Sequence, residues 1–215
     1  SEDDRNVYIN TNNLLTKIVQ KTLGNNSDFK YLTTSNLFPK GGIRNNRPKD
    51  LWCSIVNKDS ENFVNMPQVF MIVSWRGVEL GFSASIHPSD FSDQSVKKKL
   101  KKVIPSLFKL IPDSSSNIIN SLKYEINISG DWRYKTKTRL ESKKNDFKSL
   151  EKFILFLKSP KGLKQGSGSI SKFFLPDELG NEKLSLEREF INCFNIFKPL
   201  RRSFGKDYIL ADELV

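Results

Sequence analysis

The chain has 215 residues and a formal net charge of +11, because 35 lysine and arginine residues stand against 24 acidic ones. A chain of this length can bury a sizeable core. Its positive charge favours a polyanionic partner, and nucleic acid is favoured over an acidic membrane. The base composition of the genome can also enrich lysine. No apolar run reaches the roughly 20 residues that span a bilayer, and a single histidine excludes a multi-histidine metal site. Two cysteines without metal-ligand spacing indicate reduced thiols in a cytoplasmic protein.

The first half of the chain predicts one helix and three strands. Apolar residues recur at helical spacing over residues 13–23, and Gly24 ends that helix. A basic loop rich in turn-forming residues follows at 41–50. Three strands are then expected, over residues 51–56, 68–75 and 78–86. The last two form a hairpin through the tight turn Arg76-Gly77.

The second half alternates helices and strands. Ser92 or Asp93 caps a helix that runs to about Ile111, with Pro105 kinking or dividing it. The further expected elements are a short helix over 113–122, strands over 124–128 and 131–140, a helix over 147–157, a glycine- and serine-rich loop over 161–171 and a helix over 184–197. Together they predict a single α+β domain over residues 1–215, with a mixed, mostly antiparallel sheet flanked by helices. The missing initiator methionine favours a part of a longer protein.

A basic row is predicted on the strand Asp-Trp-Arg-Tyr-Lys-Thr-Lys-Thr-Arg, residues 131–139. Side chains on a strand alternate between faces, and same-face neighbours lie about 6.6 Å apart, close to the phosphate spacing of a nucleic-acid strand. The row that would follow a DNA backbone is Arg133, Lys135, Lys137 and Arg139. Trp132 and Tyr134 point to the other face and are better explained as core. A solvated edge strand is the alternative.

Residues 50–85 resemble a known family. A glycine-bearing loop precedes the strand Asp50-Leu51-Trp52-Cys53-Ser54-Ile55, and a polar insert is followed by Met66-Pro67. A β-rich run, a turn and Val78-Glu79-Leu80-Gly81-Phe82-Ser83-Ala84-Ser85 complete the order. This arrangement is similar to the N-terminal DNA-binding domain of McrB-type restriction proteins, which recognise modified cytosine. Leu51 stands where that family has a proline, and Met66 where it has an aromatic residue.

The resemblance implies a non-catalytic module of a modification-dependent restriction system that binds double-stranded DNA and needs no cofactor. A motor ATPase or GTPase and a nuclease would be supplied by other domains or subunits. The modified base would be extruded into a pocket, and the matching positions are Trp52, Met66 and Phe70. The loop before Trp52 would enter the duplex, with Ile43 as a wedge. Its contacts to phosphates or base edges would be Arg44, Arg47 and Lys49.

Each predicted site has an alternative. Trp52 and Phe70 lie on strands, where an aromatic residue is commonly core. Lys161 and Lys164 flank glycines that permit backbone amides to approach phosphate, but a flexible surface loop would have the same composition. That loop lacks the Gly-Lys-Ser/Thr ending of a nucleotide-binding P-loop.

The leading alternative function is a magnesium-dependent DNA nuclease. Asp131, Glu141 and Lys143 have the order of an Asp…Glu-x-Lys centre. In such a centre two carboxylates hold Mg²⁺ and a lysine positions the attacking water. The apolar residues that usually lead into Glu-x-Lys are absent here.

Overall fold

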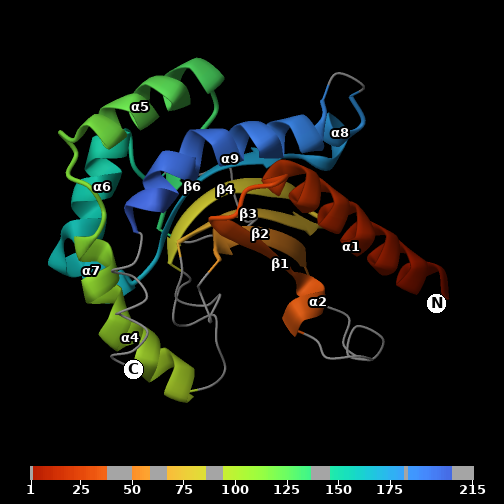
Figure 1. Cartoon of the computed structure of the whole chain (residues 1–215), viewed down its shortest axis with the longest axis horizontal. Helices are drawn as coiled ribbons and strands as arrows, with labels where there is room; N and C mark the ends of the chain where they lie inside the picture. Colours follow the sequence, from red (N-terminus) through yellow and green to blue (C-terminus); the bar gives the residue numbers. More distant parts are fainter. Residues whose placement is uncertain are drawn as a thin grey trace.

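The computed structural model describes residues 2–37, 50–58, 67–85, 94–136, 146–181 and 184–204. Its centre is a six-stranded sheet in the order β1-β2-β3-β4-β6-β5, and every pairing is antiparallel (Figure 1). The strands are β1 (Phe29–Thr33), β2 (Leu51–Asn57), β3 (Gln68–Ser74), β4 (Gly77–Ser85), β5 (Arg133–Lys135) and β6 (Gly168–Phe174). The predicted α+β class and the β3–β4 hairpin are confirmed.

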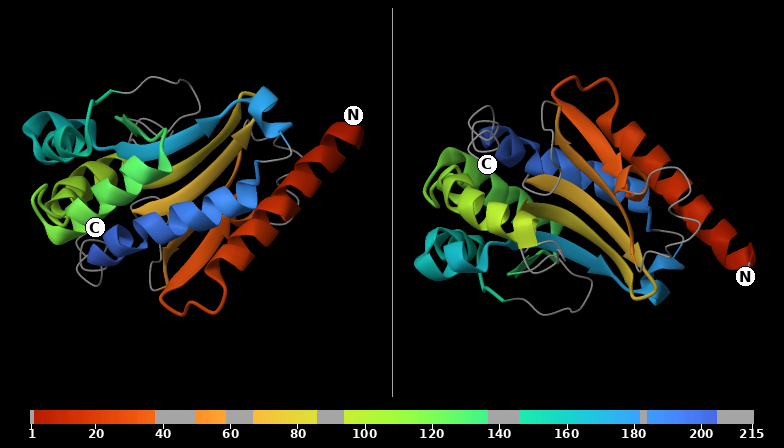
Figure 2. Two further views of the ribbon diagram at one scale, coloured as in Figure 1. Left: turned by 90° about the horizontal axis from the view of Figure 1, so that it is seen from above. Right: turned by 90° about the horizontal axis from the view of Figure 1, so that it is seen from below.

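Helices cover one face and one end of this sheet. They are α1 (Glu2–Leu23), α2 (Thr34–Leu37), α4 (Gln94–Lys109), α5 (Asn117–Ser129), α6 (Leu150–Lys158), α7 (Pro160–Gln165), α8 (Pro176–Leu179) and α9 (Leu186–Ser203). Helices α1 and α9 lie side by side across one face, while α4 to α7 gather at one end (Figures 1 and 2). In the part of the chain that the structure describes, no helix has both the length and the apolar character to cross a membrane.

The face under α1 and α9 carries the hydrophobic core, because the apolar residues of each strand alternate toward it. On β4, Phe82 stacks on Phe197 of α9 with ring centroids 5.6 Å apart. Trp132 meets the same Phe197 edge-on at 5.1 Å, and Tyr134 packs against Phe153. Trp132 and Tyr134 are 7% and 8% exposed, which confirms that both belong to the core.

The opposite face of the sheet is polar and also buried, and we call it the polar face. Its buried polar members are Ser54, Gln68, Glu79, Ser83, Ser85, Lys135, Ser169 and Ser171, and buried Phe70 lies among them. Seen from below, no described helix crosses in front of β2 to β4 (Figure 2, right). The composition follows from the alternation on β4, where Glu79, Gly81 and Ser83 occupy the positions between core residues. Polar side chains shielded from solvent in such number are uncommon on one face of a sheet.

Two expected elements were wrong because longer-range packing overrode local composition. Residues 124–128, expected as a strand, belong to α5, where Ile119, Leu122 and Ile126 are buried at helical spacing. Residues 161–171, expected as a loop, form α7 and β6. Ser159 Oγ accepts from the Gly162 N–H at 3.1 Å, and Gly166, at φ 70°, ends α7 in the left-handed conformation.

Candidate nucleic-acid interface

The strand register sorts the polar face into three cross-strand rows. Residues of one row face each other across neighbouring strands about 4.8 Å apart, and successive rows lie about 6.6 Å apart. The rows, in order along β4, are Trp52–Ile72–Glu79–Phe173, then Ser54–Phe70–Gly81–Ser171–Arg133, then Gln68–Ser83–Ser169–Lys135. Gly81 lies at the middle of this array. No residue with a Cβ fits there, because that atom would lie 2.1 Å from the carbonyl oxygen of Ile170 on β6.

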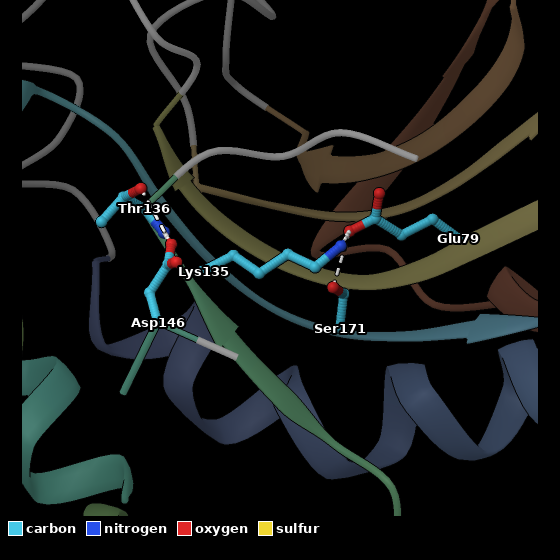
Figure 3. A network of polar contacts seen from close by, with 5 residues as sticks. All are labelled: Glu79, Lys135, Thr136, Asp146 and Ser171. Carbon is cyan, nitrogen blue, oxygen red and sulfur yellow. Dashed lines mark hydrogen bonds and ion pairs between the residues drawn. The ribbon is translucent and has the colours of Figure 1, made fainter. Parts of the chain in front are cut away.

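An ion pair between Lys135 and Glu79 occupies this array (Figure 3). Lys135 Nζ lies 3.1 Å from Glu79 Oε1, and Ser171 Oγ donates a hydrogen bond to the same oxygen at 2.6 Å. The two charged side chains are 6% and 0% exposed. Burial raises the pKa of the Glu79 carboxyl, and the charge of Lys135 and the hydrogen bond from Ser171 partly oppose that rise. The network therefore fixes the position of one carboxylate oxygen.

The other carboxylate oxygen, Glu79 Oε2, is buried and has no hydrogen-bond partner. Figure 3 shows it directed away from Lys135 and Ser171. Ser54 Oγ on β2 and one terminal nitrogen of Arg133 on β5 are likewise buried and unpaired. Buried polar atoms are paired in the great majority of cases, so three such atoms on one sheet face suggest a site for a polar ligand.

Trp52 and Phe70 lie on the polar face, on neighbouring strands and in neighbouring rows. Trp52 is half-buried, and its backbone is fixed by Thr34, whose Oγ1 accepts from the Trp52 N–H at 2.7 Å. Phe70 is 3% exposed. The structure therefore brings together two of the three residues predicted to line a pocket, on the side of the sheet away from the main core. The third, Met66, lies outside the described residues.

The predicted basic row on β5 is only partly realised. Arg133 and Lys135 do share a face, as expected, because they pair with Ser171 and Ser169 of β6. The expectation that Lys135 faces solvent and contacts a DNA backbone is wrong, because its ammonium group is buried against Glu79. Arg133 is half-buried. Lys137 and Arg139 lie outside the described residues.

A cluster of exposed positive charge among the described residues lies on α4 and α7, which pack against each other. We call these side chains the α4–α7 lysine patch: Lys98, Lys101, Lys102, Lys161 and Lys164. No ion pair involves any of them within the described ranges. Both helices lie at the end of the sheet, with α4 extending below it toward the side of the polar face (Figure 1). Lys161 and Lys164 were thus predicted as exposed cations on a loop and occur as exposed cations on a helix.

Several predicted residues fall outside the described ranges. They are Ile43, Arg44, Arg47 and Lys49 of the basic loop, and Glu141 and Lys143 of the alternative nuclease centre. Asp131, the remaining member of that centre, is exposed and has a positive φ of 57°. Within the described ranges no three His, Cys, Asp or Glu side chains come close enough to hold a metal ion.

Sequence reasoning did not identify Glu79 as a site residue. Its position between Val78 and Leu80 resembles that of a solvent-facing residue on a half-buried strand. All nine residues of β4 are buried, however, because β3 and β6 flank it and both of its faces are shielded. The signal that could have revealed the site is the pair of alternate serines, Ser169 and Ser171, which supplies small polar side chains to the same face. No family model, curated protein or solved structure matches the chain.

Proposed function

We propose that this chain is a non-catalytic recognition module that binds double-stranded DNA and reads a modified cytosine extruded from the duplex. Such a module belongs to a modification-dependent restriction system, in which a motor NTPase and a nuclease come from other domains or subunits. The proposal joins the resemblance of residues 50–85 to McrB-type domains with the polar face of the sheet.

The observation that carries the proposal is the combination of aromatic side chains and unpaired polar atoms on that face. Extrusion costs a few kcal/mol of stacking and pairing, which the protein must recover from the base itself. Half-buried Trp52 offers aromatic surface for a planar ring, and buried Phe70 lies on the neighbouring strand beside it. Glu79 Oε2 and Ser54 Oγ offer hydrogen-bonding capacity that the folded chain leaves unused. A stacking surface next to unused polar atoms suits a nucleobase better than it suits a purely apolar ligand.

Affinity for the duplex would come from positive charge at the end of the sheet. The α4–α7 lysine patch has exposed ammonium groups that can reach phosphates without breaking an ion pair among the described residues. Phosphate contacts position a protein on DNA and carry no sequence information. The lysine patch would therefore set overall affinity, whereas the polar face would set the choice of base.

The test is a fluorescence-anisotropy titration of matched duplexes that carry cytosine, 5-methylcytosine or 5-hydroxymethylcytosine at one position. Measurements at two salt concentrations in EDTA separate electrostatic binding from metal-dependent chemistry. Salt-sensitive binding with a preference for one modified duplex is the expected result. Equal affinity for all three duplexes would contradict the reader function, and no binding at either salt concentration would contradict DNA binding altogether.

A further inference from the structure

We infer that Glu79 reads the exocyclic amino group of the extruded cytosine, with Glu79 Oε2 accepting a hydrogen bond from the N4 amine. This inference rests on the proposed function and assigns its base-specific contact to one atom. It makes Glu79 the residue that separates a modified cytosine from thymine.

The two oxygens of the Glu79 carboxylate differ in their contacts. Glu79 Oε1 accepts from both Lys135 Nζ, at 3.1 Å, and Ser171 Oγ, at 2.6 Å. These two contacts hold the carboxylate group in place. They leave Oε2 in a fixed orientation, away from Lys135 and Ser171, which bind Oε1 (Figure 3). A buried acceptor without a partner destabilises the fold, because its lost contacts with water are not replaced. A ligand that donates an N–H to Oε2 removes that destabilisation, which gives the site a built-in preference for donors.

Glu79 lies next to an aromatic side chain on the sheet. Phe70 pairs with Gly81, the residue two places after Glu79, so the Phe70 ring and the Glu79 carboxylate lie in adjacent rows of adjacent strands. Ser54, with its own unpaired hydroxyl, faces Phe70 from the other side. An aromatic ring is thus flanked by two unused polar atoms. This is the arrangement that a planar base with polar edges requires.

Cytosine and thymine differ in the polar group that they would present to Glu79. Cytosine presents an amino group at the position where thymine presents a carbonyl oxygen, and carboxylates accept from the cytosine amine. A thymine carbonyl directed at Glu79 Oε2 would place two acceptors in contact. 5-Methylcytosine and thymine have nearly the same shape, so contacts with the ring and its methyl group cannot separate them. The discrimination must come from a polar atom, and Glu79 Oε2 is placed to provide it.

The experiment compares wild-type protein with Glu79→Gln on two duplexes that differ only in one base, 5-methylcytosine or thymine, each opposite an abasic site. The abasic site removes the pairing that would otherwise make extrusion of the two bases unequal. Glutamine retains a carbonyl oxygen that accepts from Lys135 and Ser171 and places an amide N–H₂ where Oε2 was. We expect wild-type protein to bind the methylcytosine duplex about tenfold more tightly, and the variant to lose or invert that ratio.

Each outcome decides one claim. If wild-type protein prefers methylcytosine and Glu79→Gln retains the same ratio, the assignment of Glu79 is wrong and the reader function stands. If wild-type protein binds neither duplex, the proposed function itself fails. Should Glu79→Gln not fold, the ratio is measured on Glu79→Gln/Lys135→Met, which leaves no buried charge unpaired. Glu125→Gln, the same change at an exposed position on α5, is the matched control and should leave the ratio unchanged.

Discussion

Lys135 and Glu79 form a buried ion pair between two strands that are not neighbours in the sheet. Lys135 lies on β5 and Glu79 on β4, and β6 lies between those strands. The lysine side chain therefore spans β6 to bring Nζ within 3.1 Å of Glu79 Oε1. Removing two charges from water is costly unless they compensate one another, so each member of the pair depends on the other.

This dependence predicts strong coupling in a double-mutant cycle. Lys135→Met should lower the free energy of unfolding by about 3–5 kcal/mol, because it leaves the Glu79 carboxylate buried without its cation. Adding Glu79→Gln should restore much of that loss, since the second change removes the uncompensated charge. Urea unfolding of the four proteins measures the coupling. Additive effects of the two substitutions would show that the pair does not contribute as a unit.

The same pair predicts a defined pH dependence of stability. Burial raises the folded-state pKa of Glu79 above its ordinary value of 4.5, so the folded protein holds this proton more tightly than the unfolded chain does. Stability should then fall as pH rises from about 4.5 through the folded-state pKa, by at most about 1.4 kcal/mol per pH unit. In wild-type protein the charge of Lys135 partly opposes the rise in the Glu79 pKa. Lys135→Met removes that opposition, so the stability of this variant should keep falling to a higher pH. The variant Glu79→Gln/Lys135→Met should lack this decline, and an identical decline in that variant would assign it to other groups.

The α4–α7 lysine patch predicts a change in the salt dependence of DNA binding. Lys101→Ala/Lys164→Ala should weaken binding to modified and unmodified duplexes equally and reduce the slope of log affinity against log salt by about 1.8. Arg5→Ala/Lys17→Ala removes the same charge from exposed positions on α1, which covers the other face of the sheet, and is the matched control. Anisotropy titrations over a series of salt concentrations give the slopes. Equal changes in both variants would mean that the effect comes from net charge and not from the patch.

Trp52 predicts a change in selectivity without loss of general affinity. Trp52→Ala should reduce the preference for the modified duplex about tenfold or more, because base–aromatic stacking contributes about 1–3 kcal/mol. Binding to unmodified DNA should change little. Trp52→Phe retains an aromatic surface and should recover part of the preference. A similar loss on both duplexes, accompanied by a lower melting temperature, would identify Trp52 as a structural residue only.

The two cysteines test the packing of the core directly. Burial raises the pKa of Cys53 to about 12, and it also raises the pKa of Cys193 well above its ordinary value. Both thiols should therefore fail to react with Ellman's reagent at pH 8 in the native protein and react promptly in urea. A thiol that titrates rapidly without denaturant would contradict the burial of the strand or helix that carries it.

Local patterns in the sequence predicted the elements whose apolar residues recur with a regular period. The β3–β4 hairpin has alternating apolar residues around a two-residue turn, and α9 has a continuous apolar stripe. The α5 segment 124–128 was misassigned because Tyr124, Ile126 and Ile128 also alternate with a period of two. In α5 only Ile126 of these three is buried, so the helical spacing with Ile119 and Leu122 is the pattern that packing uses.

The sequence predicted the aromatic residues of the candidate site but not its buried ion pair. Trp52 and Phe70 are aromatic residues on adjacent strands, and the sequence placed them near each other correctly. Glu79 and Lys135 are 56 residues apart in the chain, and β6, which lies between them, was expected to be a loop. Without β6 in the sheet, neither the burial of Lys135 nor its contact with Glu79 follows from any local pattern.

The strand order also has a consequence for how the chain folds during synthesis. β5 precedes β6 in the sequence, yet β6 separates it from β4, so β5 has no neighbour in the sheet until residues 168–174 have been made. Until then the carboxylate on β4 lacks both the lysine and the serine that hold it. The hairpin and α1 can form from contacts already available, whereas the β4–β6–β5 edge closes late and through long-range pairing. A nascent or truncated chain that ends before β6 would expose an unpaired edge of β4 with an uncompensated charge.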